Sequence, residues 1–147
     1  MSEKKLNLQS QARRAVLKID PTERPRLVLL AIDGPSQYLM GAIGLLGMLV
    51  QHAYFVTVTD RAVYVHRGPR TKSAPSELVA VVPLGEAGGL VHEVKRGKVW
   101  NALFLKLPGR ARPLRLNVSS HSRPELESFL KKLPGAAATT EAGVRTA

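Results

Sequence analysis

The sequence contains no cysteine among its 147 residues. This absence excludes disulfide bonds, thiol nucleophiles and cysteine-ligated zinc, and it is consistent with a reducing compartment. The chain begins M-S-E-K-K-L-N and shows no apolar core followed by small residues, so no secretory signal is expected. We therefore expect a cytoplasmic protein, and 147 residues is the size of a single domain that can bury its own core.

Carboxylates are scarce, with eleven Asp and Glu against 22 Lys and Arg. The four histidines are separated by 14, 26 and 29 residues, which does not match the short spacings of metal ligands. Ser36 in G-P-S-Q-Y lacks the second glycine of a nucleophile elbow, and no phosphate-binding glycine motif occurs. The sequence therefore predicts no catalytic residue, no metal site, no cofactor and no small-molecule substrate, so we do not expect an enzyme.

Aromatic residues are also few, with one Trp, three Tyr and three Phe. This scarcity counts against nucleic-acid binding, although a net charge of +11 and a sequence pI near 10.6 are the footprint of a phosphate binder. The aromatics Tyr54, Phe55, Trp100 and Phe104 sit in strand patterns, where core packing is the simpler role. Non-specific nucleic-acid binding is therefore kept only as a second alternative.

The basic charge is concentrated in short windows rather than spread along the chain. Residues 61–72 hold four basic side chains, and residues 95–115 hold seven with no acidic residue. Both windows contain turn signals, Gly68-Pro69 in the first and Arg96-Gly97 in the second. The sequence thus predicts basic loops.

The N-terminal residues carry a helical pattern. One face would present Leu8, Ala12, Ala15, Val16 and Ile19, and Asp20-Pro21 ends the run. Two interpretations of residues 1–22 remain open, a short basic amphipathic helix and a loosely ordered arm.

The middle of the chain reads as strands. An apolar run from Arg24 closes at Asp33-Gly34-Pro35, and two β-branched runs after residue 53 meet at Asp60-Arg61 as a hairpin. A further strand contains Pro83, which fits only an edge, a bulge or a strand end. A second hairpin should turn at Arg96-Gly97, with Val99, Leu103, Leu105 and Leu107 on one face and Trp100 and Phe104 on the other. In the last strand, Leu114, Leu116 and Val118 should point inward and Arg115 and Asn117 outward.

The end of the chain predicts an amphipathic helix followed by a tail. Ser122 and Glu125 have capping-box spacing, Pro124 suits a first turn, and Pro134-Gly135 ends the pattern. The apolar face would hold Leu126, Phe129, Leu130 and Leu133. Residues 136–147 have nothing to bury, and we expect them to be disordered.

The strand and helix order resembles that of bacterial pleckstrin-homology-like (PH-like) domains. The resemblance rests on Y-F-V-T-V-T-D-R-A-V-Y-V, V-V-P-L-G and L-E-S-F-L-K-K-L, and it covers residues 53–133. It implies a mainly β fold at residues 23–135, a seven-stranded antiparallel barrel or sandwich capped by the C-terminal helix. It also implies binding or scaffolding without catalysis, and three loops that share one end of the barrel.

An apolar segment interrupts this pattern. Residues 38–50 carry no charge, and Gly41, Gly44 and Gly47 are spaced three apart. Thirteen helical residues rise about 20 Å, which is short of a hydrocarbon core of about 30 Å. We expect a helical insertion near residues 36–51, with a small-residue stripe that allows close packing. Burial against the barrel, against a second copy or in a membrane interface all remain open.

The predicted contact surface combines this segment with the basic loops. Its members are Leu39, Met40, Ile43, Leu46, Arg67, Arg70, Lys72, Arg110 and Arg112. The main hypothesis is a non-catalytic scaffold or adapter that self-associates as a homo-oligomer or docks a protein partner. The alternative is a peripheral binder of anionic lipid surfaces through the same residues.

Overall fold

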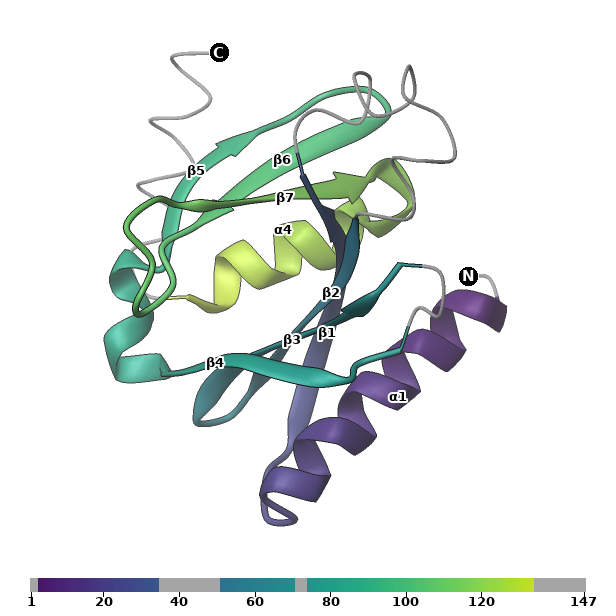
Figure 1. Ribbon diagram of the computed structural model, residues 1–147, viewed down its shortest axis with the longest axis vertical. Helices are drawn as coiled ribbons and strands as arrows, with labels where there is room; N and C mark the ends of the chain where they lie inside the picture. Colours follow the sequence, from purple (N-terminus) through teal and green to yellow (C-terminus); the bar gives the residue numbers. More distant parts are fainter. Residues whose placement is uncertain (1–2, 35–50, 71–73, 134–147) are drawn as a thin grey trace.

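The computed structural model of the chain describes residues 3–34, 51–70 and 74–133. Seven antiparallel strands form one curled sheet in the order β4-β3-β2-β1-β7-β6-β5, which confirms the predicted mainly β class (Figure 1). Their bounds are β1 (Pro25–Asp33), β2 (His52–Thr59), β3 (Ala62–Pro69), β4 (Glu77–Pro83), β5 (Val91–Lys95), β6 (Trp100–Leu105) and β7 (Leu114–Ser119). The predicted insertion near residues 36–51 and the tail at residues 136–147 lie outside the described residues.

Both predicted hairpins form, and each turns at the residues that the sequence indicated. β2 and β3 are joined by Asp60 and Arg61, and β5 and β6 are joined across Arg96-Gly97. Pro83 is the last residue of β4, which is an edge strand, so its missing N–H removes no bond from the middle of the sheet. β1 ends at Asp33, and Gly34 follows with φ +103°, a conformation that an L side chain would strain.

β1 joins the two halves of the sheet. Most of its length pairs with β2, while Ile32 pairs with Asn117 and Asp33 with Leu116 of β7. A 3₁₀ helix, η1 (Leu84–Gly89), connects β4 to β5. Figure 1 shows the β1–β4 and β5–β7 parts facing each other around α4 (Arg123–Lys132). This arrangement makes one core between the two parts.

The core is built from the inward-facing residues of both parts and from α4. Leu29, Val56, Leu103 and Leu116 are fully buried, and Phe129 of α4 packs into the same cluster with 0% exposure. The predicted apolar face of the C-terminal helix is therefore confirmed. Burying side chains of this size removes apolar surface from water, which is the main favourable contribution to folding.

The start of α4 differs from the expected capping box. Ser122 occupies the N-cap position, but its side chain makes no cap hydrogen bond. The Glu125 carboxylate instead forms an ion pair with Lys5 of α1 (Glu3–Ile19), and the Lys5 ammonium also donates to the His121 carbonyl at 2.7 Å. Glu125 is thus paired with Lys5 of a distant helix instead of taking part in a capping box with Ser122.

α1 is the helical alternative for the N-terminal residues. Ala12 packs against Val28 of β1 and Phe55 of β2, and Val16 packs against Tyr64 of β3. The predicted apolar face is correct at Ala12 and Val16 but not at Ile19, which is 48% exposed. α1 lies on the outer face of the sheet, opposite the core. Ile19, in its last turn, is not buried against the strands.

One predicted position is wrong, and one outward-facing residue is unexpectedly buried. Val99 is 53% exposed, because it belongs to the β5–β6 turn and β6 begins only at Trp100. Asn117 alternates with the inward-facing Leu116 and Val118, as predicted, but it is only 1% exposed. Its neighbour in the sheet is the end of β1, and its side-chain amide donates to the Gly34 carbonyl at 3.3 Å.

Candidate functional site

The basic residues of the first predicted loop are engaged within the fold. Arg67 forms a bidentate pair with Glu77 across β3 and β4, with N–O distances of 2.8 and 3.3 Å. This guanidinium holds the pKa of the Glu77 carboxyl below its usual value. Arg70 donates to the side-chain oxygen of Gln51. Arg67 and Arg70, which were expected to face a partner, therefore make contacts with other residues of the same chain.

Arg110 and Arg112 lie elsewhere. Both are exposed in the β6–β7 connection, which follows Leu105 and runs beside η1. Figure 1 shows this connection on the opposite side of the molecule from the end of β3 and the start of β4. The described basic loops are not gathered at one end of the sheet, unlike the arrangement that the resemblance implied. Lys72, the four apolar contact residues and the three glycines of the predicted surface lie outside the described residues.

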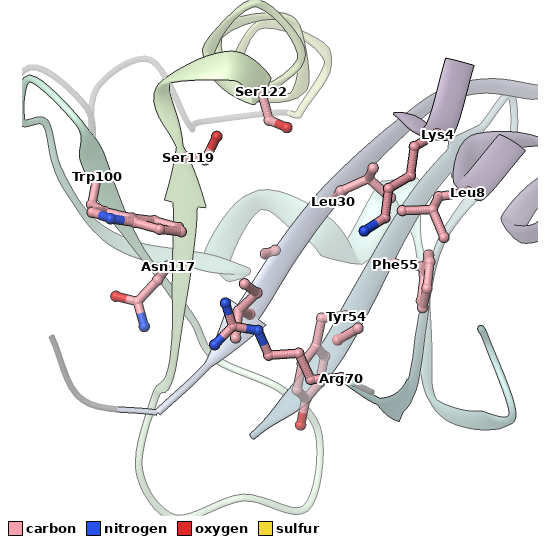
Figure 2. A pocket seen from close by; sticks show the side chains of 13 residues that line it. Lys4, Leu8, Leu30, Tyr54, Phe55, Arg70, Trp100, Asn117, Ser119 and Ser122 are labelled. Carbon is pink, nitrogen blue, oxygen red and sulfur yellow. The ribbon is translucent and has the colours of Figure 1, made fainter. Parts of the chain in front are cut away.

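A pocket of about 300 Å³ opens where β1 passes from β2 to β7, and we call it the β1–β7 pocket. Its apolar lining includes Leu8, Leu30 and Phe55, and its polar lining includes Lys4, Arg70, Asn117, Ser119 and Ser122. Figure 2 shows Arg70 extending past Tyr54 toward Asn117, while Lys4 approaches from α1 on the Leu8 side. The indole of Trp100 lies on the β6 side. Two cations beside hydroxyl and amide groups suit an anionic group.

The polar groups near this pocket also hold the ends of β1 and β2 together. The Gln51 side chain donates to the Asp33 carbonyl at 3.0 Å, and the backbone N–H of His52 donates to the Asp33 carboxylate at 2.7 Å. The His52 ring lies 3.1 Å from the second carboxylate oxygen of Asp33. These contacts join the end of β1 to the start of β2 beside the pocket.

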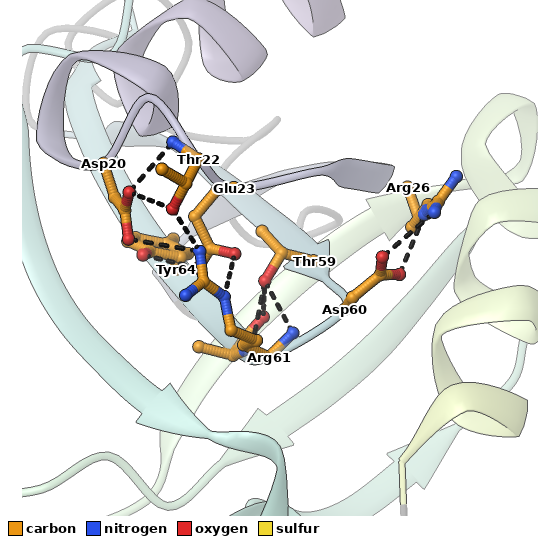
Figure 3. A network of polar contacts seen from close by, with 9 residues as sticks. Asp20, Thr22, Glu23, Arg26, Thr59, Asp60, Arg61 and Tyr64 are labelled. Carbon is orange, nitrogen blue, oxygen red and sulfur yellow. Dashed lines mark hydrogen bonds and ion pairs between the residues drawn. The ribbon is translucent and has the colours of Figure 1, made fainter.

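A polar network fastens the end of α1 to the β2–β3 turn (Figure 3). The Tyr64 hydroxyl donates to the Glu23 carboxylate at 2.7 Å, and Arg61 donates to the other oxygen of Glu23 at 3.1 Å. Burial, reinforced by the hydrogen bond to Glu23 and its charge, raises the pKa of Tyr64 to about 12. Bonds from the hydroxyl and the backbone N–H of Thr22 hold the pKa of Asp20 below its usual value. The network therefore attaches the residues after α1 to the β2–β3 turn and to β3 through hydrogen bonds between distant parts of the chain.

A second hollow lies between α1 and the start of β4, and we call it the α1–β4 groove. Its volume is about 750 Å³. One wall is formed by α1 and the other by residues 74–78, with His66 of β3 between them. The lining includes Arg14, Lys18, Ile19, His66, Glu77 and Leu78. Exposed apolar side chains (Ile19 and Leu78) and exposed cationic side chains (Arg14 and Lys18) therefore line the same groove.

His66 is the unusual group in this groove. It is 4% exposed, and its Nδ1 has no hydrogen-bond partner. Burial lowers the pKa of its imidazole, so the ring is neutral at pH 7. A buried polar atom without a partner is costly, which marks this position as one where a contact is incomplete.

Other kinds of site find no support in the part of the chain that the structure describes. Within residues 3–34, 51–70 and 74–133, no cluster of three His, Cys, Asp or Glu could hold a metal ion. No helix among the same residues is both long and apolar enough to cross a bilayer.

Of the residues that line the two hollows, sequence reasoning named only Arg70 as part of a contact surface. Lys4, Trp100, Ser119 and Ser122 come from three distant segments, and no local spacing connects them. From the sequence, His66 was considered only as a metal ligand, for which its spacing from the other histidines is unsuitable. One signal was available: His66 follows the inward-facing Val65 in β3, and successive side chains of a strand point to opposite faces, so His66 faces the α1 side.

Comparison with known proteins finds no match: no family model, no curated protein and no solved structure matches this chain.

Proposed function

We propose that this chain is a non-catalytic, PH-like adapter domain that docks a protein partner or a second copy of itself. The PH-like assignment is supported by the strand order, in which β1 joins a four-stranded part to a three-stranded part around a C-terminal helix. Fold alone does not define function, so the adapter role has to rest on a surface.

The observation that carries the proposal is the outer face of β4 and the groove between it and α1. Leu78 and Val81 of β4 are 41% and 39% exposed, and Ile19, which lines the same groove as Leu78, is 48% exposed. Single exposed apolar residues are ordinary, but several along one edge strand and an unfilled groove favour a protein contact. A protein surface can bury such residues and satisfy the groove's polar atoms in the same contact.

Peripheral binding to an anionic membrane is the second candidate. Lys4 and Arg70 at the β1–β7 pocket and the exposed pair Arg110 and Arg112 favour it. Each basic residue near an anionic surface contributes about 1 kcal/mol, so a few of them give weak, salt-sensitive binding. The separation of these groups on the molecule makes simultaneous contact with one flat surface harder.

The solution mass of the full chain, with and without vesicles of an anionic phospholipid, separates the two candidates. At physiological ionic strength we expect a mass of 16.0 kDa or a multiple of it, unchanged by vesicles. Capture by the vesicles that is reversed by salt and lost in R110E/R112E would overturn the adapter proposal and establish the membrane alternative.

A further inference from the structure

We propose that the α1–β4 groove binds an acidic amphipathic helix of a partner protein, which packs between α1 and the outer face of β4. This inference rests on the adapter function proposed above and names the occupant of its surface.

The first argument is the space that the sheet leaves uncovered. α1 covers β1 and β2 through Ala12 and β3 through Val16, and the outward-facing Ala62, Tyr64 and His66 of β3 are buried. The exposed part of the outer face is β4, where Leu78 and Val81 are 41% and 39% exposed. The groove of about 750 Å³ lies between the start of β4 and α1. A helix, about 10 Å across with its side chains, can lie over this groove and the outer face of β4.

The second argument is the apolar content of that face. In the sheet register, Val81 lies opposite Tyr64, and Leu78 lies opposite His66. Both therefore face outward, on the same side as α1. Ile19, the last residue of α1, and Leu78 both line the groove. Apolar residues of a helix at i, i+3, i+4 and i+7 would cover such a strip, which is the helix-in-groove mode of recognition.

The third argument is charge. Arg14 and Lys18 lie on the α1 wall and are exposed, and within the described ranges neither forms an ion pair. Glu77 on the opposite wall is already paired with Arg67. A partner that presents carboxylates is thus favoured. A second copy of the chain is disfavoured here, because each copy carries a net charge of +11.

The fourth argument is the unpartnered imidazole. Neutral His66 can make one further hydrogen bond at Nδ1, as donor or acceptor according to its tautomer. Since Nδ1 is buried, a hydroxyl, amide or carboxyl group in the groove satisfies it only when the His66 ring turns toward the groove that it lines. Among the groove residues, His66 alone combines deep burial with a missing partner, so it would add specificity to a contact made mainly by apolar and charged groups.

The test uses the full chain and a designed 18-residue peptide with leucines along one helical face and glutamates along the other. Its dissociation constant is measured by fluorescence anisotropy, beside that of the same peptide with lysines in place of the glutamates. We expect the acidic peptide to bind and the basic one not to bind. The double variant R14E/K18E should weaken binding by about tenfold or more, since two attractions become repulsions.

The matched control is R110E/R112E, which changes the net charge by the same amount on the other side of the molecule. It should alter the dissociation constant by less than about twofold. L78S tests the apolar wall without changing charge, and it should also weaken binding. All three variants alter exposed residues, and circular dichroism should show an unchanged fold.

Three results would overturn this inference. These are no binding of the acidic peptide, equal weakening by the two double variants, and binding that L78S leaves unchanged. Each of them refutes the acidic helix as the occupant of the groove, whereas the adapter function, which rests on the same face, is refuted separately by the vesicle experiment. Salt-reversible capture by vesicles would instead remove the adapter function itself.

Discussion

Replacing Phe129 with alanine is expected to lower the free energy of unfolding by about 3–5 kcal/mol. Phe129 is 0% exposed and packs between the two parts of the sheet, so its removal leaves a cavity that the surrounding strands can fill only in part. Domains of this size are stable by only about 5–15 kcal/mol, and the loss is therefore a large fraction of the total. Chemical denaturation followed by circular dichroism measures it as a shift of the midpoint.

Val99→Ala is the control for this result. Val99 is apolar like Phe129 but 53% exposed, so its truncation should change stability by less than about 0.5 kcal/mol. If both variants lost the same small amount, α4 would not be part of the core, and the closure of the curled sheet by this helix would be wrong.

Replacing Glu23 with alanine should cost about 1–3 kcal/mol. The Glu23 side chain is 3% exposed, and it accepts hydrogen bonds from both Tyr64 and Arg61. Without it, the buried Tyr64 hydroxyl loses its acceptor and α1 loses its main polar attachment to the β2–β3 turn. The same denaturation experiment reports the cost.

Asp60→Ala provides the comparison, because it breaks an ion pair that is geometrically similar but solvent-exposed. Arg26 and Asp60 form two hydrogen bonds of 2.8 and 2.9 Å with side chains that are 50% and 49% exposed. Such pairs contribute about 0–1 kcal/mol. A loss for Asp60→Ala as large as that for Glu23→Ala would mean that burial does not set the importance of the network.

The strands could be predicted because their signals are local. The Asp60-Arg61 hairpin, the placement of Pro83 and the inward alternation of Leu114, Leu116 and Val118 follow from neighbours a few residues away. The apolar face of the C-terminal helix is equally local, since it repeats within ten residues. These patterns are short-range, and the structure confirms them.

The remaining features depend on residues that are distant in the sequence. Tyr64 and Glu23 are 41 residues apart, and Lys5 reaches Glu125 across nearly the whole chain. The Glu125 capping prediction failed because a tertiary ion pair competed with the local bond. The burial of the outward-facing Asn117 could not be predicted, because a two-residue alternation does not show that the end of β1 lies beside it.

The candidate surface shows the same limit. The sequence correctly indicates that basic residues concentrate in loops, but Arg67 is paired within the sheet and Arg110 and Arg112 lie on another side of the molecule. The α1–β4 groove could not be predicted, because it exists only where the tertiary packing of α1 leaves the start of β4 uncovered.

Mapping the contact by two-dimensional NMR of the isotope-labelled full chain, with the unlabelled acidic peptide, tests the central claim most directly. A docking surface beside α1 predicts that the largest shifts occur at Arg14, Lys18, His66, Leu78 and Val81. Shifts concentrated at Trp100 and Asn117, or at Arg110 and Arg112, would place binding at the β1–β7 pocket or on the β6–β7 connection. Either result would contradict the claim that the α1–β4 groove and the outer face of β4 are where this protein meets its partner.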